Sequence, residues 1–144
     1  MAPLEPISRD VLFLGFRQAR ERYESAKLQD DPAPAFIALF EALSWAVSID
    51  ERLNRPAHPE LRGLRYARHA VQHMWADALE LDRGGADLPI TLPMSLFEWR
   101  WRQQLWPPPR NRDDEPAYLE HLAGRPARRA LEAVDQFLTE LSGR

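Results

Sequence analysis

The placement of thirteen prolines along 144 residues constrains this chain more than any other feature. Proline lacks a backbone donor and breaks the interior of helices and strands, but the first turn of a helix tolerates it. The prolines precede runs with helical apolar spacing: Pro32 and Pro34 before Phe36–Leu53, Pro59 before Leu61–Leu81, and Pro126 before Ala127–Leu141. The pattern therefore predicts helices that begin at prolines and are joined by short connections.

Apolar residues recur at helical spacing over four long segments. We expect helices over Ser8–Lys27, Ala35–Asn54, Pro59–Arg83 and Pro126–Leu141, with a shorter one over Pro116–Leu122. No segment shows the clean period-two alternation of a half-buried strand. The sequence thus predicts one all-α domain over residues 1–144, a four-to-five-helix bundle with a loop-rich segment between the third and last long helices.

The loop-rich segment, residues 86–117, allows two interpretations. Ser95-Leu96-Phe97-Glu98 is a capping-box pattern and predicts a short helix over Leu96–Leu105. The alternative is an extended strap that Trp99, Trp101 and Trp106 hold against the bundle.

Composition excludes several classes of protein. The chain has no cysteine, so it has neither disulfides nor thiolate sites. A formal net charge of -3 and a pI near 5.8 argue against a protein that coats DNA. No apolar run approaches the ~20 residues of a membrane helix, and residues 1–10 lack the pattern of a signal peptide. We therefore expect a cytoplasmic protein that makes no membrane contact.

The predicted third helix carries a cationic face. Residues 61–76 contain no acid, although the chain as a whole is acidic. Six polar residues fall within an arc of roughly 140° on an ideal helix: Arg62, Arg65, Arg68, His69, Gln72 and His73. Arginines without interleaved acids forgo the usual i,i+4 ion pairs, and histidines add groups that titrate near neutrality. Either this face has a function or it is a solvated helix surface.

Arg68 and His73 form an R-x4-H motif on the third long helix of a small helical domain. This resembles the HEPN superfamily, whose ribonuclease members carry such a motif on a late helix of a four-helix bundle. His69 stands where asparagine is the commoner residue. The resemblance implies RNA cleavage at a homodimer interface, without a metal or a cofactor. Arg68 would then stabilise the phosphorane and His73 would transfer a proton, with His69 as the next catalytic candidate.

Further residues are candidates for holding RNA. Arg65, Arg62 and Gln72 share the cationic face with the motif. Arg100 and Arg102 alternate with aromatic residues in Phe97–Arg102, a pattern that can contact unpaired bases. The competing interpretation of that segment is that Trp99 and Trp101 close the open side of the bundle.

Two acidic positions have alternative interpretations. Asp50 and Glu51 end the second helix, and a carboxylate there either orients an arginine or a histidine of the third helix or belongs to a solvated helix end. His69, His73 and Asp77 follow at i, i+4 and i+8, which resembles a two-histidine, one-carboxylate metal site. The neighbouring arginines would repel a dication, so we expect no metal.

Three functions remain open from the sequence. The first is a metal-independent endoribonuclease of a bacterial toxin or defence system, acting as a homodimer with an antitoxin or a nucleotidyltransferase as a possible partner protein. The second is an inactive HEPN-like domain that binds RNA or a nucleotide. The third is a helical protein whose arginine face docks an acidic partner. The i,i+5 spacing of Arg68 and His73 favours a two-fold dimer, because one ideal helix would point them about 140° apart.

Overall fold

The computed structural model describes residues 7–29, 31–71, 75–83 and 97–143. These ranges contain the helices α1 (Arg9–Lys27), α2 (Pro32–Arg52), α3 (Pro59–Ala70), α4 (Glu115–His121) and α5 (Ala127–Ser142). They also contain a 3-10 turn, η1 (Trp75–Asp77), and the strands β1 (Leu79–Asp82) and β2 (Glu98–Trp101). The structure is 65% helical with one small two-stranded hairpin, so the mostly helical architecture is confirmed and the all-α class is too narrow.

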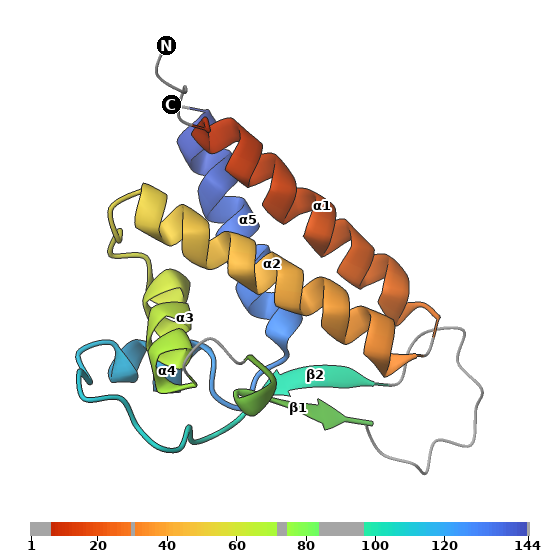
Figure 1. Ribbon diagram of the computed structural model, residues 1–144, viewed down its shortest axis with the longest axis vertical. Coiled ribbons are helices and arrows are strands. Elements are labelled where there is room, and N and C mark those ends of the chain that lie inside the picture. Colours follow the sequence, from red (N-terminus) through yellow and green to blue (C-terminus); the bar gives the residue numbers. More distant parts are fainter. Residues whose placement is uncertain (1–6, 30, 72–74, 84–96, 144) are drawn as a thin grey trace, which may run out of the picture.

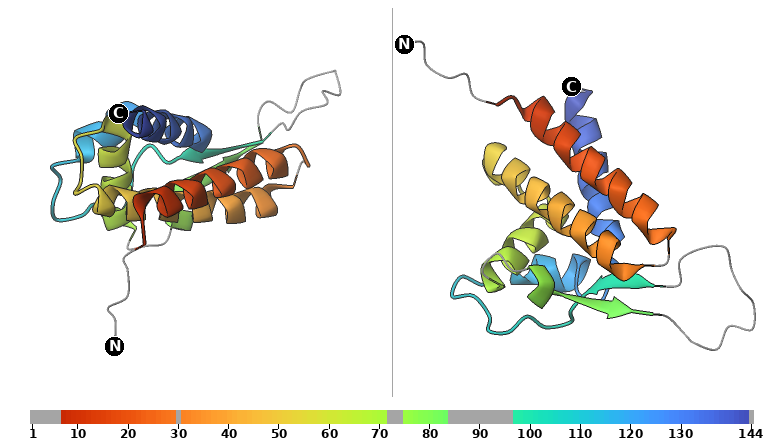
Figure 2. Two further views of the ribbon diagram at one scale, coloured as in Figure 1. Left: turned by 90° about the horizontal axis from the view of Figure 1, so that it is seen from above. Right: turned by 45° about the vertical axis from the view of Figure 1, so that its right-hand side comes forward.

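Helices α1 and α2 form an antiparallel pair, and α5 lies behind them in a second layer (Figures 1 and 2). Helix α3, helix α4 and the hairpin sit together at the end of the molecule away from the start of α1 and the end of α5 (Figure 1). The core between the layers contains large, fully buried side chains from distant parts of the chain, including Phe16, Tyr23, Leu43, Leu64 and Trp101.

The helices begin where the prolines predict. Pro32 occupies the first turn of α2, and the Asp31 side chain caps that helix by accepting from the Ala33 backbone N–H at 3.1 Å. Pro59 stands in the first turn of α3, and Pro126 immediately precedes α5. Because these positions need no intrahelical N–H donor, proline fixes the helix starts without losing a hydrogen bond.

Helix α2 is long and apolar enough to cross a membrane by length and composition alone, which the sequence analysis did not anticipate. Within this structure its side chains Leu39, Leu43 and Ile49 are fully buried in the domain core. The core helix of a globular domain can pass the same test; here 44% of the apolar window is buried, while Ile37 and Phe40 are exposed.

The predicted third helix is too long. Helix α3 ends at Ala70, and Leu79–Asp82 is a strand. That strand pairs with β2 so that Leu79 faces Trp101 and Leu81 faces Trp99. Leu79 and Trp101 are both buried, and such apolar cross-strand pairs outweigh the helical spacing of the local sequence. The alternation in Leu-Glu-Leu-Asp and Glu-Trp-Arg-Trp is therefore the period-two signal that the sequence analysis missed.

The capping-box helix over Leu96–Leu105 is also wrong, because Glu98–Trp101 is extended. The strap interpretation is closer to the structure. Trp101 is fully buried, and Trp99 packs against Phe36 and donates its indole N–H to the Pro32 carbonyl at 3.2 Å. Trp106 differs from both, since 85% of it is exposed. Two tryptophans thus close the bundle, while the third faces solvent.

Candidate functional site

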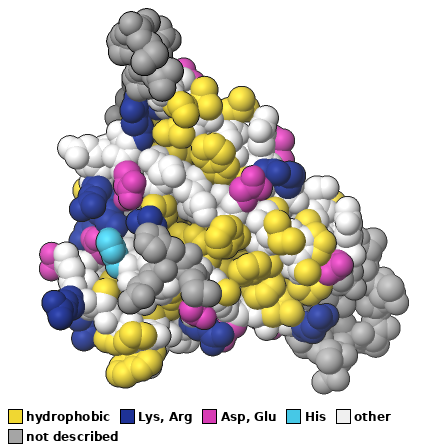
Figure 3. Space-filling model, in the orientation of Figure 1, with side chains coloured by type: hydrophobic (Ala, Val, Ile, Leu, Met, Phe, Trp, Pro, Cys, Tyr) yellow, Lys and Arg dark blue, Asp and Glu magenta, His cyan; other side chains and the backbone are white. Residues whose placement is uncertain are grey.

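Helix α3 presents one face to the core and the other to solvent, as its amphipathic sequence predicts. Leu61, Leu64 and Ala67 are buried. Arg62, Arg65, Arg68 and His69 lie on the more exposed side. Figure 3 shows Arg and His side chains gathered on the α3 side of the visible face, apart from the hydrophobic side chains over α1 and α2.

Arg65 is held in a two-pronged contact with Asp50 from the last turn of α2. Its Nε and Nη2 atoms donate to the two Asp50 carboxylate oxygens at 2.8 and 2.7 Å. Nη2 also donates to the Pro56 carbonyl at 3.1 Å. Asp50 is only 4% exposed, and its hydrogen bonds raise the pKa of the Arg65 guanidinium. The interpretation of Asp50 as a carboxylate that orients an arginine of the third helix is therefore confirmed.

The other two arginines of α3 are also paired, which corrects the expectation of an unpaired cationic stripe. Arg62 Nε lies 2.9 Å from an Asp114 oxygen, and Arg65 Nη1 lies 3.6 Å from the other oxygen. Arg68 makes a longer, exposed contact of 3.5 Å with Glu51. Residues 61–70 of the helix contain no acid, but α2 and the segment before α4 supply the acids that pair with these arginines.

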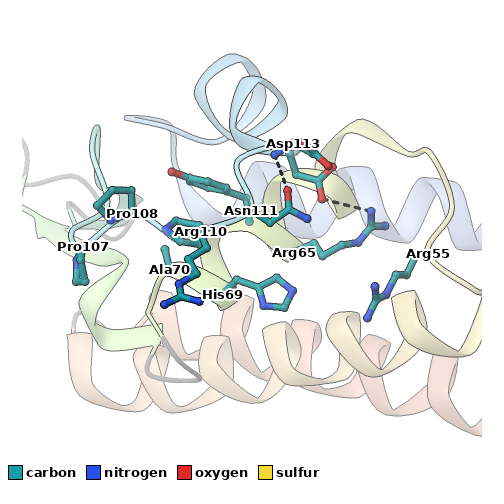
Figure 4. Close-up of a pocket in the computed structure, with 12 residues that line it drawn as sticks. Arg55, Arg65, His69, Ala70, Pro107, Pro108, Arg110, Asn111 and Asp113 are labelled. Atoms are coloured by element: carbon teal, nitrogen blue, oxygen red, sulfur yellow. Dashed lines mark hydrogen bonds and ion pairs between the residues drawn. The ribbon is translucent and has the colours of Figure 1, made fainter.

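A cleft of about 780 Å³ opens between α3 and the segment 107–114 (Figure 4). His69 and Ala70 of α3 form one part of its lining, and Pro107–Arg110 forms another. Arg55, from the turn between α2 and α3, completes a row in which His69 is drawn between Arg110 and Arg55 (Figure 4). The cleft therefore collects basic side chains from three separate parts of the chain.

The charges of this cleft do not cancel. Arg65 is neutralised by Asp50 behind it, and Asp114 by Arg62. Among the described residues, no ion pair or hydrogen bond engages the side chains of Arg55, His69 or Arg110. The carboxylate of Asp113 also lines the cleft and opposes them, although Figure 4 draws it beyond Asn111, away from the row. Two unpaired guanidinium groups and an imidazole thus face one aspartate.

Arg55 reaches the cleft through an unusual backbone. Asn54 and Arg55 have φ values of 59° and 53°, in the left-handed region that residues with side chains rarely adopt. The Arg55 N–H donates to the Asp50 carbonyl at 2.8 Å, which holds this turn against the end of α2. Left-handed residues in succession are retained only where the surrounding contacts impose them.

Tyr66 forms the wall at the α4 side of the cleft. Its hydroxyl donates to Glu115 Oε2 at 2.6 Å, and Arg112 donates to the same oxygen at 2.6 Å. Burial, and then the bond to Glu115, raise the pKa of Tyr66 to about 12, while these two donors lower the pKa of Glu115. Tyr66 therefore stays protonated at neutral pH and is a fixed hydrogen-bond donor rather than a base.

Other predicted site residues lie elsewhere or outside the described part. Gln72 and His73 fall outside the described residues, so the distance between His73 and Arg68 is not described. Arg100 pairs with Asp82 at 2.6 Å and Arg102 with Glu80 at 3.6 Å. Arg100 lies in β2 and Arg102 directly follows it, so both pairs link this strand to β1. Neither arginine lines the cleft.

The helical argument for a metal site does not hold. It needed His69, His73 and Asp77 on one continuous helix, but α3 ends at Ala70 and Asp77 lies in η1. Within residues 7–29, 31–71, 75–83 and 97–143, no group of three His, Cys, Asp or Glu side chains is placed to hold a metal ion.

The sequence analysis missed Arg55 and Arg110. A local signal existed, because each is adjacent to proline, in Arg55-Pro56 and Pro109-Arg110. Proline fixes its own φ, so Pro56 and Pro109 limit the conformations of the loops that carry these two arginines. Nothing in the sequence indicates that these two loops meet across α3.

Replacing Asp50 by asparagine should cost about 3 kcal/mol of the free energy of unfolding, because Arg65 would keep its buried charge and lose its main partner. The matched control is E51Q at the next position, which removes the exposed contact to Arg68. That change should cost less than about 1 kcal/mol. Urea unfolding of both variants checks the difference, and equal losses would show that the Asp50–Arg65 pair is not the stronger contact.

No family model, curated protein or solved structure matches this chain. The similarity to HEPN proteins therefore rests on the R-x4-H motif and its place in a helical domain, and it remains an expectation.

Proposed function

We propose that this chain is an RNA-binding endoribonuclease that holds the RNA backbone in the cleft between α3 and residues 107–114 and cleaves it without a metal. One observation carries the proposal: Arg55, His69 and Arg110 line a single cleft of about 780 Å³ with no partner among the described residues. Guanidinium groups form paired hydrogen bonds with phosphate oxygens, and imidazole can carry a proton at neutral pH.

The reaction fits these groups because RNA supplies its own nucleophile. The 2′-oxygen attacks the adjacent phosphorus and gives up its proton to a base. The bond from phosphorus to the 5′-oxygen breaks, and an acid delivers a proton to that leaving oxygen. The products are a 2′,3′-cyclic phosphate and a 5′-hydroxyl. Arginine donors stabilise the negative charge on the phosphoryl oxygens as the transition state forms.

The roles differ from those that the HEPN resemblance implies. That resemblance gives the phosphoryl contact to Arg68, but Arg68 pairs with Glu51 and does not line the cleft. In our proposal Arg55 and Arg110 make this contact, and His69 carries one proton. His73, which the motif predicts as the general base or acid, stays a proposed proton carrier on the strength of the motif alone.

The partners also stay proposals. The resemblance implies a homodimer, and an antitoxin or a nucleotidyltransferase as a partner protein. The spacing argument for a dimer assumed one helix through Arg68 and His73, and α3 ends between them at Ala70. The dimer therefore rests on the resemblance. Binding without cleavage is the competing function, and the same cleft would serve it.

RNA binding should weaken with salt in proportion to the number of phosphates held in the cleft. Each of R55A and R110A should reduce the slope of log affinity against log salt by about 0.7, the value for one contact to a single strand. Fluorescence anisotropy with a labelled RNA, titrated at several salt concentrations, measures this slope.

Two variants control that measurement. R129A removes an exposed arginine of α5 that does not line the cleft, so its slope should equal that of the parent. D113N removes the opposing carboxylate of the cleft and should strengthen binding. Equal slopes for R55A, R110A and R129A would place the RNA elsewhere on the surface.

Cleavage should persist in EDTA and leave 2′,3′-cyclic phosphate ends. H69A should slow it by about 10²- to 10⁴-fold, the usual contribution of a general acid or base. H73A in the same assay tests the role that the motif assigns to His73. Gel analysis of a labelled RNA gives these rates: R129A should cleave as the parent does, and cleavage at the parental rate by identically purified H69A would indicate a contaminating nuclease.

A preparation that cleaves only after Mg²⁺, Mn²⁺ or Zn²⁺ is added would contradict this mechanism. Binding that depends on Arg55 and Arg110 without any cleavage would favour the inactive RNA-binding domain. If the parent neither binds nor cleaves RNA, the interaction-protein interpretation takes its place.

A further inference from the structure

A second, smaller hollow adjoins the basic cleft. It has a volume of about 290 Å³ and shares Tyr66 and Pro108 with the cleft, so the two spaces lie on either side of the same residues. Trp106, Gln103 and Gln104 contribute to its lining. The rest of its lining is aromatic and aliphatic apart from Arg112 and Glu115, which pair with each other at 2.6 Å, so it differs from the neighbouring cleft, which has unpaired arginines.

Trp106 is the exposed tryptophan of this domain. It is 85% exposed, whereas Trp75 and Trp101 are buried and Trp99 packs against the core. An indole ring is one of the largest apolar surfaces that a side chain offers. The ring of Trp106 is exposed to solvent at the edge of the hollow. Exposed aromatic rings next to a basic groove are the platforms on which unpaired bases stack in proteins that bind single strands.

The side-chain amides of the two glutamines differ in how closely the protein contacts them. Gly124 has a φ of +74°, and a Cβ built there would lie 2.2 Å from Gln103 Nε2, so the Gln103 amide rests against the Gly124 backbone. Gln104 is exposed, and within the described part of the chain no hydrogen bond occupies its amide. A free amide has both a donor and an acceptor, which matches the edge of a nucleobase.

We propose that this hollow is a nucleobase subsite, in which one unpaired base stacks on Trp106 with its edge toward Gln104. The proposal rests on the function proposed above, because the phosphate of the same nucleotide or of its neighbour would lie in the adjoining basic cleft. The substrate class is therefore single-stranded RNA. In an RNA duplex the bases are stacked on each other, and their faces cannot reach a side chain.

Base stacking and phosphate contact can be separated with two probes. One is a 2′-O-methyl uridine oligonucleotide, which lacks the nucleophile and cannot be cleaved. The other has the same backbone and length with abasic sugars. Removing a stacking platform weakens binding by roughly 5- to 100-fold per base. W106A should show such a loss with the uridine probe and bind the abasic probe as the parent does.

Two variants sharpen this test. W106F keeps an aromatic face and should stay within about threefold of the parent, because a smaller ring still stacks. L28A removes an exposed apolar side chain of similar character that lines neither space, and it should change nothing. A duplex RNA of the same sequence should bind the parent and W106A equally.

Failure of this inference differs from failure of the proposed function. If R55A and R110A weaken the uridine probe while W106A does not, the cleft binds RNA and the base subsite is wrong. If W106A weakens both probes equally, Trp106 does not stack on a base, and the proposal is also overturned. A third outcome is that the parent self-associates. If W106A then has a lower sedimentation coefficient than the parent and binds RNA equally well, the Trp106 ring makes a protein contact and the base subsite is wrong.

Discussion

The contact between Asp50 and Arg65 holds together the parts of the structure that form the candidate site. It joins the end of α2 to α3, and the same guanidinium reaches the Pro56 carbonyl and Asp114. Residues 50–56 and Asp114, the last of which lies about fifty positions further along the chain, are therefore both tied to Arg65 of α3. Because Asp50 is nearly inaccessible to solvent, its charge is tolerated only while Arg65 is present. The walls of the cleft depend on this pair.

The arginines of this chain have two kinds of role, and their surroundings separate them. Arg62 and Arg65 are paired with acids that come from other segments, so they hold the fold together. Arg55 and Arg110 lie on loops, line the same cleft and have no partner among the described residues. Unpaired guanidinium groups that share a concave space are suited to an anionic ligand, whereas paired ones on a helix face are not. Counting arginines in the sequence could not make this distinction.

The sequence predicted most of the helices because their signals are local. Prolines and helical spacing gave the starts of α2, α3 and α5. The hairpin was missed, because Leu79 and Trp101 adopt the strand conformation through burial against each other across 22 positions of sequence. The site was predicted only in part for the same reason. His69 was identified from its motif, but the acids that pair with the α3 arginines, and the loops that carry Arg55 and Arg110, meet α3 only in the folded chain.

The central claim is that RNA lies in the space between α3 and residues 107–114. The most direct measurement is photo-crosslinking of a single-stranded RNA containing 4-thiouridine, followed by mass spectrometry of the modified peptides. Our account predicts adducts on the peptides that contain His69 and Trp106, and their loss when Arg55 and Arg110 are both replaced by alanine. Adducts confined to other surfaces, such as the outer face of α5, or adducts that survive the double replacement, would contradict it.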